Sequence, residues 1–179
     1  MINAKLVLRE LKKKAVSHVV GIPDNSSAAL FSLLTEEEGP QLITVTREGE
    51  AFAIAAGIWM GGQTPVVLVQ NTGLLESGDS IRGTVQRMRI PLLCLITYRG
   101  YGKMASLQFS PTLEDFNAEA LSRPDLDSVA LLTEPTLRAW GLPFTFLRRD
   151  EDIPQIAESF KQAEERSQPV AVLVTGNLV

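Results

Sequence analysis

Hydrophobic positions along this chain alternate between the spacing of helices and the continuous apolar runs of buried strands. A helical stripe formed by Ala4, Leu8, Leu11 and Ala15 predicts a first helix. Further helices are predicted over residues 24–39, 48–61, 74–89, 112–121 and 134–140, and along the stripe Ile153, Ile156, Phe160 and Ala163. The predicted strands read HVVGIP, QLITVT, PVVLVQ, IPLLCLIT, PFTFL and PVAVLV, and GYGKMASLQFSP between them is predicted to be a glycine-containing loop.

Strands that alternate with helices over the whole length predict an α/β fold with a mostly parallel sheet. We expect one domain over residues 1–179, with three layers, six strands and helices on both faces, as in flavodoxin-like folds. PVVLVQ and IPLLCLIT show no polar alternation, which indicates strands covered on both faces. Ligands of such sheets sit outside the carboxyl ends of the strands, so the segments 22–27, 46–50, 70–78 and 98–111 carry the candidate chemistry.

Composition and charge exclude several classes of function. The chain has 179 residues, 45% of them hydrophobic, and a formal net charge of −4. This mild acidity, without a long basic run, argues against nucleic acid as the main partner. No stretch reaches the ~18 apolar residues of a membrane span, and the N-terminal segment lacks the apolar core of a signal peptide. A reduced, cytoplasmic setting without membrane association is therefore expected.

Metal, nucleophile and phosphate sites also find little support in the sequence. Cys94 is the single cysteine and lies in an apolar run, which is typical of a buried strand thiol. His18 is the single histidine, so neither a zinc site nor a Ser-His-Asp triad is expected, and no metal ligand is predicted in this chain. Neither a GxGxxG turn nor a Walker A motif is present, so no phosphate cradle is predicted.

The stretch TREGEAFAIAAGIWMGG, residues 46–62, combines acids with small side chains. Glu48 and Glu50 open the predicted helix, where an acid interacts favourably with the helix dipole, worth about 0.3–1 kcal/mol. The helix then carries an unusual number of small residues: Ala51, Ala53, Ala55, Ala56 and Gly57. Small residues permit close approach, either of this domain's own sheet or of a partner protein, and the sequence leaves both open.

Several motifs together resemble one known family. They are GIPDNSSAALFSLL, ITVTREGEAFAIAAGIWMGG, PVVLVQNTGLLES and IPLLCLITYRG, which fall between residues 16 and 100. This series is similar to the pyrimidine-binding (PYR) domain of thiamine-diphosphate enzymes, and most similar to the alpha subunits of sulfopyruvate decarboxylases and the N-terminal half of phosphonopyruvate decarboxylases. From Tyr101 onward only the order of elements matches, with WGLPF and the closing PVAVLV.

The resemblance implies a catalytic role for Glu48, nine residues before Gly57. In the family a glutamate at this place hydrogen-bonds N1′ of the thiamine diphosphate pyrimidine, which prepares the cofactor to attack a 2-oxo acid and to accept the electrons released with CO₂. Sharing a proton near neutral pH requires a dry site. A second protein surface would exclude water, so Glu48 is expected to meet the cofactor and the small-residue helix to meet a neighbouring subunit.

The resemblance also implies partners. In the family the diphosphate and Mg²⁺ are held by a PP domain through a GDG…N motif, which this chain lacks, since SGDS at residues 77–80 does not match it. We therefore expect a PP-domain beta subunit that holds Mg²⁺, a second copy of this chain, and an active site at the interface. The expected substrate is a small 2-oxo acid.

The sequence leaves two possible roles for each of the other candidate site residues. The family's turn after the third strand lines the pyrimidine pocket, although ordinary turn chemistry also explains the residues here: Gln70, Asn71, Thr72 and Gly73. The turn after the first strand faces substrate in the family, but its residues Pro23, Asp24 and Asn25 could equally cap a helix. Arg99 suits a sulfonate, phosphonate or carboxylate, or else a surface salt bridge.

One departure from the family leaves rival functions open. The segment 100–111 contains no histidine, whereas the decarboxylases carry an acid-and-histidine stretch there. This leaves open which 2-oxo acid is used and whether Lys103 or Gln108 takes part. The alternatives are a non-catalytic PYR-like assembly or regulatory subunit, a carboligase half with the same cofactor, and a flavodoxin-like domain without thiamine chemistry.

Overall fold

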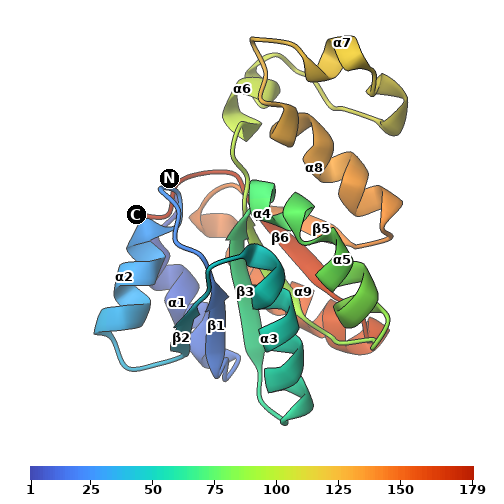
Figure 1. The fold of residues 1–179 in the computed structure, drawn as a ribbon. Coiled ribbons are helices and arrows are strands. Elements are labelled where there is room, and N and C mark those ends of the chain that lie inside the picture. Colours follow the sequence, from blue (N-terminus) through green and yellow to red (C-terminus); the bar gives the residue numbers. More distant parts are fainter.

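The computed structural model describes residues 1–179, and its centre is a six-stranded sheet in which every neighbouring pair is parallel. The strand order is β2-β1-β3-β4-β6-β5 (Figure 1). The predicted number of strands and the α/β class are thus confirmed, and the sheet is entirely parallel. The strands are β1 (His18–Gly21), β2 (Gln41–Thr44), β3 (Pro65–Gln70), β4 (Leu93–Thr97), β5 (Phe144–Leu147) and β6 (Val170–Val174).

Helices cover both faces of the sheet and complete three layers. One face carries α1 (Ala4–Lys13), α2 (Ala28–Glu36) and α9 (Pro154–Arg166). The other carries α3 (Glu48–Met60), α4 (Asn71–Glu76), α5 (Gly78–Ser80) and the π-helical segment η1 (Ile81–Gln86), and α8 (Ser128–Ala139) packs beside α4. Successive strand residues enter opposite cores, as Val66 and Val67 do, which explains why the central strands read as unbroken apolar runs.

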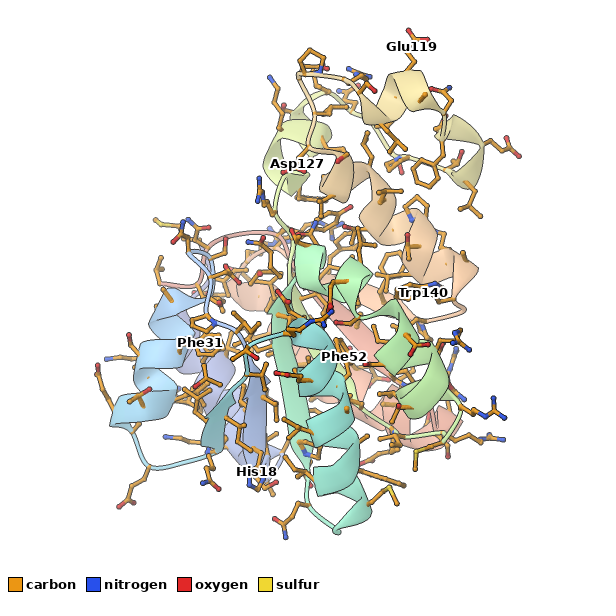
Figure 2. All side chains as sticks on the ribbon, in the orientation of Figure 1. His18, Phe31, Phe52, Glu119, Asp127 and Trp140 are labelled. Carbon is orange, nitrogen blue, oxygen red and sulfur yellow. The ribbon has the colours of Figure 1, made fainter.

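Residues 101–139 form a helical lobe beyond the carboxyl ends of the strands. The lobe contains α6 (Tyr101–Ser106), the 3-10 turn η2 (Leu113–Asp115), α7 (Ala118–Leu121) and α8, and Figure 1 shows α6 and α7 extending away from the sheet. A further 3-10 turn, η3 (Asp150–Asp152), precedes α9. Glu119 marks the far tip of this lobe, and Asp127 lies where the lobe approaches the sheet (Figure 2).

Two predictions in and near the lobe are wrong. Residues 100–111 are not only a loop, because Tyr101 and Met104 pack into the core three residues apart and support α6, after a left-handed Gly100 with φ 83°. The helix expected over 134–140 begins at Ser128, since the Asp127 side chain accepts the Val129 N–H and caps it. Pro135 lies inside this helix, where burial of its apolar face offsets the cost of proline.

Other helix boundaries differ from the sequence prediction. The helix expected over 74–89 already begins at Asn71 and continues as α4, α5 and η1. Ala15 lies outside α1 in a left-handed conformation with φ 52°, so it does not extend the stripe. The segment 112–121 splits into η2 and α7, although Thr112 and Asp115 make the expected capping contacts.

The strand order creates a switch point between β1 and β3. The chain leaves β1 toward β2 on one side, whereas β3 continues toward β4 on the other side. In open α/β sheets the ligand crevice lies outside the carboxyl ends of two such strands. This places the segments after β1, β2 and β3 at the edge where a ligand is expected.

None of the helices combines the length and the apolar character that a membrane crossing requires.

Candidate active site

Glu48 lies directly against Gly73 at the carboxyl edge of the sheet. Glu48 is the first residue of α3, which follows β2, and Gly73 belongs to α4, which begins immediately after β3. A Cβ built on Gly73 would stand 2.5 Å from Glu48 Oε1 and overlap the carbon atoms of the same side chain. Only glycine therefore leaves room for the half-buried Glu48 side chain in this position.

The other carboxylates near the start of α3 are engaged within the chain. Glu50 Oε2 accepts hydrogen bonds from the Thr46 N–H at 3.1 Å, the Thr46 hydroxyl at 3.0 Å and the Arg47 N–H at 3.2 Å. These bonds, first of all that of the Thr46 N–H, lower the pKa of Glu50. Although Glu50 is exposed, as expected, it thus also caps α3.

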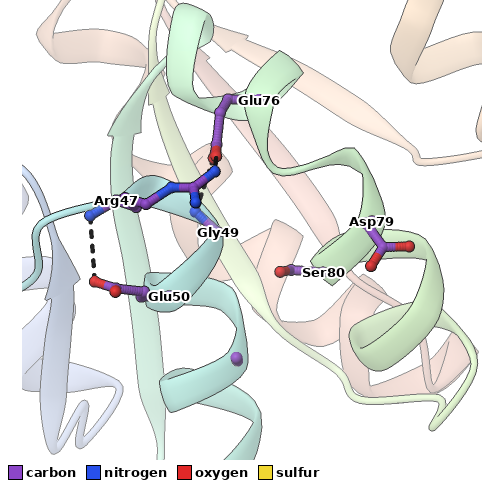
Figure 3. Close-up of a pocket in the computed structure, with 7 residues that line it drawn as sticks. Arg47, Gly49, Glu50, Glu76, Asp79 and Ser80 are labelled. Carbon is purple, nitrogen blue, oxygen red and sulfur yellow. Dashed lines mark hydrogen bonds and ion pairs between the residues drawn. The ribbon is translucent and has the colours of Figure 1, made fainter.

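Glu76 is held near the start of α3 by Arg47. It forms an ion pair with Arg47 and accepts the Gly49 N–H at 3.1 Å (Figure 3). The hydrogen bond from Arg47 is the main reason that the pKa of Glu76 is lowered. None of these hydrogen bonds or ion pairs uses the Glu48 carboxylate, which therefore remains free to meet a group from outside the chain.

A cleft between α3 and the α4–α5 segment has a volume of about 370 Å³. The charged residues that line it are the acids Glu50, Glu76 and Asp79 and one cation, Arg47, which pairs with Glu76 (Figure 3). Glu48 does not line this cleft. The cleft is therefore a neighbour of the Glu48–Gly73 contact rather than a pocket around it.

Helix α3 has small or apolar residues on both of its faces. Ala51, Phe52, Ala55 and Ala56 are buried under the sheet, and Figure 2 shows Phe52 on this inner side. On the outer side a Cβ added at Gly57 would touch nothing within 4 Å. The exposed residues there are Ala53, Ile54, Gly57 and Met60. The buried alanines thus pack against the chain's own sheet, Ala53 and Gly57 are open to solvent, and contact with a partner protein stays a prediction.

Asn71 ties β3 to β4 and to the helical lobe. Its side chain is fully buried, donates to the Arg99 carbonyl at 3.1 Å and to Thr133 Oγ1 at 2.9 Å, and accepts the Arg99 N–H at 3.2 Å. The Asn71 amide is thus satisfied by this chain's own groups. Next to it, the exposed Thr72 donates its hydroxyl proton to Gln70 Oε1 at 3.1 Å.

Asp24 fixes the turn after β1. Its carboxylate accepts the N–H groups of Ser26 and Ser27 at 2.6 and 3.2 Å, the Ser27 hydroxyl at 2.9 Å and the Thr97 hydroxyl at 2.8 Å. The first three bonds organise the turn that leads into α2, and the fourth joins it to the end of β4. Asp24 therefore organises the turn before α2, whose N-cap residue is Ser27, while Pro23 is exposed and lines a separate groove beside α2.

A cavity of about 450 Å³ lies along the carboxyl ends of β1, β3, β4 and β6. It brings together three residues singled out from the sequence: Asn25, Gln70 and Arg99. Arg99 is 60% exposed, and its Nε lies 2.9 Å from Asp127 Oδ2. The structure thus places the sequence-selected residues in two neighbouring groups, one around Glu48 and Gly73 and one around this cavity.

Tyr98 lines this cavity and connects the end of β4 to α8. Its hydroxyl donates to the Ala130 carbonyl at 3.0 Å and lies 3.4 Å from Glu134 Oε1, and Glu134 also pairs with Arg138. Burial, followed by the nearby Glu134 charge, raises the pKa of the Tyr98 hydroxyl far above its ordinary range. Tyr98 therefore remains protonated and joins the lobe to β4.

The single cysteine and the single histidine lie outside both groups. Cys94 is fully buried in β4, and burial raises the pKa of its thiol far above the ordinary value, so it is not a thiolate nucleophile. His18 begins β1 at the amino end of the sheet, and its Nδ1 lies 2.9 Å from the Ser17 hydroxyl (Figure 2). The position of Cys94 confirms the prediction of a buried strand thiol.

Sequence reasoning missed several residues of the cavity region. Thr175 and Asn177 follow β6 and line the cavity, and Asp127 and Thr133 of the lobe hold Arg99 and Asn71. The polar TGN that follows PVAVLV was an available signal, because it too stands at the carboxyl end of a strand. The roles of Asp127 and Thr133 had no such signal, since they depend on how the lobe folds back on the sheet.

Comparison with known proteins identifies the family of this chain. A family model described as thiamine pyrophosphate enzyme, N-terminal TPP binding domain, matches residues 1–118. The chain is also similar in fold to benzoylformate decarboxylase from Polynucleobacter necessarius, with a TM-score of 0.67 and 19% sequence identity. That likeness covers 100% of this chain and 32% of the other.

Similar sequences among characterised proteins are decarboxylases. Phosphonopyruvate decarboxylase of Streptomyces hygroscopicus is 34% identical over 100 residues, or 56% of this chain and 25% of the relative. Sulfopyruvate decarboxylase subunit alpha of Methanococcus maripaludis is 30% identical over 97 residues, or 54% of this chain and 58% of the relative. Sulfopyruvate decarboxylase of Methanosarcina acetivorans is 27% identical over 169 residues, or 94% of this chain and 39% of the relative. In each case less than two thirds of the relative is covered.

Proposed function

This chain belongs to the family of thiamine pyrophosphate enzymes, and on that premise we propose that it is the PYR subunit of a thiamine-diphosphate-dependent 2-oxo-acid decarboxylase. The names of its relatives, sulfopyruvate and phosphonopyruvate decarboxylase, support a 2-oxo acid with a second acidic group as the substrate. The subunit would act together with a PP-domain beta subunit that holds Mg²⁺ and the diphosphate.

The observation that carries the proposal is the contact between Glu48 and Gly73. Because Gly73 has no Cβ, the Glu48 side chain can lie against it at the carboxyl edge of the sheet. The neighbouring acids are used in capping and pairing, whereas the Glu48 carboxylate is not. A half-buried acid without a partner, beside the switch point, fits the aminopyrimidine of thiamine diphosphate, whose N1′ it would hold by a hydrogen bond.

Thiamine diphosphate, when bound, supplies the electron sink for the loss of CO₂ from a 2-oxo acid. The task of this chain would then be to orient the pyrimidine and to share a proton with it through the Glu48 carboxyl group. Gly73 would position Glu48, and Gln70, Asn71 and Thr72 would form the wall of the pyrimidine pocket. Asn71 would do so indirectly, because its own amide is occupied by Arg99 and Thr133.

The substrate would approach from the β1 side of the same edge. We assign Asn25 and Arg99 to direct contact with it, since both line the cavity beside Gln70. Asp24 would act by holding the turn that presents Asn25, given its four hydrogen bonds within the chain. Pro23 would shape that turn.

The outer face of α3 supports the need for a partner. Ile54 and Met60 are 37% and 63% exposed, and Ala53 and Gly57 lie between them. A helix that is apolar on both sides is normally covered on both sides. A PP-domain subunit or a second copy of this chain would cover this face and exclude water from Glu48.

The first experiment is to recover the full chain from its source cells and to identify co-purifying proteins by mass spectrometry. A partner with a GDG…N motif is then combined with the chain, and thiamine diphosphate binding and decarboxylation of sulfopyruvate are measured. With Glu48→Gln the rate should fall about 10²–10⁴-fold. The variant should keep the wild-type melting temperature, because the Glu48 carboxylate makes no bond within the chain.

Glu76→Gln is the matched control, because it removes a neighbouring acid that is engaged by Arg47. Its activity should stay near that of the wild type. Equal activity of Glu48→Gln and the wild type would contradict the catalytic role and favour a non-catalytic PYR-like subunit. Formation of a longer 2-oxo acid or hydroxyketone product instead of simple CO₂ loss would identify a carboligase half.

A further inference from the structure

The cavity along the carboxyl ends of β1, β3, β4 and β6 has the chemistry of an anion site. Of the residues that line it, Arg99 alone carries a charge, and the others are neutral polar residues, glycines, a tyrosine and a valine. Its neutral polar residues include Asn25, Gln70, Thr175 and Asn177. Thus one cation faces a polar cavity in a chain whose net charge is −4.

Arg99 is held at its base, while its outer end stays accessible. The Arg99 backbone is fixed on both sides by Asn71, which accepts its N–H and donates to its carbonyl. Its Nε is paired with Asp127 Oδ2 at 2.9 Å, and Asp127 is itself fixed because its Oδ1 accepts the Val129 N–H at 3.1 Å. The side chain is 60% exposed, so the two terminal amino groups can meet an oxyanion as a planar fork.

Two nearby acids leave the outer donors of this cation free. Asp24 precedes Asn25 but does not line the cavity, and its carboxylate accepts four hydrogen bonds from Ser26, Ser27 and Thr97. Asp127 pairs with Nε and leaves the remaining donors of the guanidinium. These donors can therefore bind an anionic ligand group.

The cavity lies next to the Glu48 region along the chain. Gln70 lines it, and Gly73, three residues later, contacts Glu48. A substrate held in this cavity would therefore lie beside the cofactor that Glu48 would hold.

We propose that this cavity binds the second acidic group of a dianionic 2-oxo acid, with Arg99 as the specificity-determining residue and Asp127 as the residue that positions it. This inference rests on the proposed decarboxylase function and deepens it. A sulfonate, a phosphonate and a carboxylate share the chemistry that Arg99 recognises, and the substrates used in the test distinguish them. A 2-oxo acid with a methyl group in place of the second acid lacks this contact.

Anion binding is tested on the full chain by titration with sodium sulfate, inorganic phosphate and acetate at constant ionic strength. Calorimetry and the ¹⁵N-labelled arginine side-chain signals provide the readouts. Wild type should bind sulfate saturably and shift the Arg99 Nε signal, and Arg99→Gln should weaken binding about tenfold or more. Arg99→Lys keeps the charge without the fork and should retain more affinity than Arg99→Gln.

Arg82→Gln is the matched control. Arg82 is 67% exposed and pairs with Asp79, but it does not line the cavity, so its loss should leave sulfate binding unchanged. Equal effects at Arg82 and Arg99, or equal losses in Arg99→Gln and Arg99→Lys, would overturn the proposal and leave only diffuse surface attraction.

The second readout is specificity in the complex with the partner subunit. We compare kcat/KM for sulfopyruvate, phosphonopyruvate and oxaloacetate with that for pyruvate. Arg99→Gln should lower kcat/KM about tenfold or more for the best dianionic substrate and by a clearly smaller factor for pyruvate, so that the preference between the two falls. If the complex decarboxylates and the preference does not change, the inference fails alone. If sulfate binds at Arg99 but no complex is active, the proposed function fails and the anion site remains.

Discussion

Two places on the same edge of the sheet carry opposite charges and are built differently. Beside β3, Glu48 rests on Gly73, and no group of the chain bonds its carboxylate. At the end of β4, Arg99 is anchored by Asn71 through its backbone and by Asp127 through its side chain. The acid is thus placed by packing against a residue without a side chain, whereas the cation is placed by hydrogen bonds and an ion pair.

This difference shows how each group can be disturbed. A position set by packing is sensitive to a single added methyl group, and a position set by hydrogen bonds is sensitive to the loss of a donor or an acceptor. Asn71 connects the two places, because it lies two residues before Gly73 and bonds the backbone of Arg99.

Asn71→Ala should have the largest effect on stability. It removes three hydrogen bonds at a fully buried site and leaves the Arg99 and Thr133 groups without their partners. We expect the free energy of unfolding to fall by about 2–4 kcal/mol, measured by urea denaturation of the full chain. Thr72→Ala, at the exposed neighbouring position, should change it by less than about 0.5 kcal/mol. Similar losses in both variants would mean that the Asn71 bonds contribute little.

Gly73→Ala should disturb the region around Glu48 but not the region around Arg99. The added methyl group overlaps the Glu48 side chain, so the free energy of unfolding should fall by about 1–3 kcal/mol. Thiamine diphosphate binding by the complex should weaken as well. Gly57→Ala is the control, because open space surrounds that position on α3, and alanine should stabilise the isolated chain by up to about 1 kcal/mol. A neutral Gly73→Ala would show that Glu48 can move without cost.

Thr97→Val should loosen the β1 turn beside the Arg99 cavity. It removes the hydroxyl that donates to Asp24 Oδ2 at 2.8 Å, while the shape of the side chain is kept. The expected loss is about 1 kcal/mol in urea denaturation. Thr145→Val, whose hydroxyl lies 3.5 Å from Gln155 Oε1, should cost less than half as much. Equal losses would remove the argument that the Asp24 bond fixes this turn.

The smallest effect concerns the acids that surround Glu48. The pKa of Glu76 is lowered in the folded chain, mainly by the hydrogen bond from Arg47, so its contribution to stability is present above its ordinary pKa of 4.5. That contribution is lost as the pH falls through the lower folded pKa. The urea midpoint of wild type should therefore exceed that of Glu76→Gln at pH 7, and the difference should shrink as the pH is lowered below the ordinary pKa of 4.5. A constant difference across this range would exclude the ionised carboxylate as its source.

The sequence predicted the sheet better than the lobe, and particular residues show why. PVVLVQ and IPLLCLIT could be recognised as central strands, because burial on both faces requires apolar residues at every position. Residues 100–111 contain two glycines and read as a loop, yet Tyr101 and Met104 find a core to pack against and form α6. Local propensity was overridden by contacts with residues distant in the sequence.

The candidate site, too, could be predicted from the sequence only in part. Glu48 could be selected from the sequence because the motif series around it resembles a known family, and its place at the start of α3 agrees with the prediction. The roles of Asp127 and Thr133 could not be selected, because neither belongs to a motif and both act through the approach of α8 to the strand ends. For the same reason, the sequence did not show that the Asn71 amide would be occupied within the chain.

By itself the sequence determined the alternation of elements, the strands buried on both faces and the acid at the start of α3, because these depend on local periodicity and on motifs within a short stretch. Only the tertiary structure decided that Gly73 lies under Glu48, that Asn71 holds the backbone of Arg99, and that polar groups from four strands share one cavity. These contacts join residues that are distant along the chain. They depend on the strand order and on the folding of the lobe, which the spacing of residues in a sequence does not encode directly.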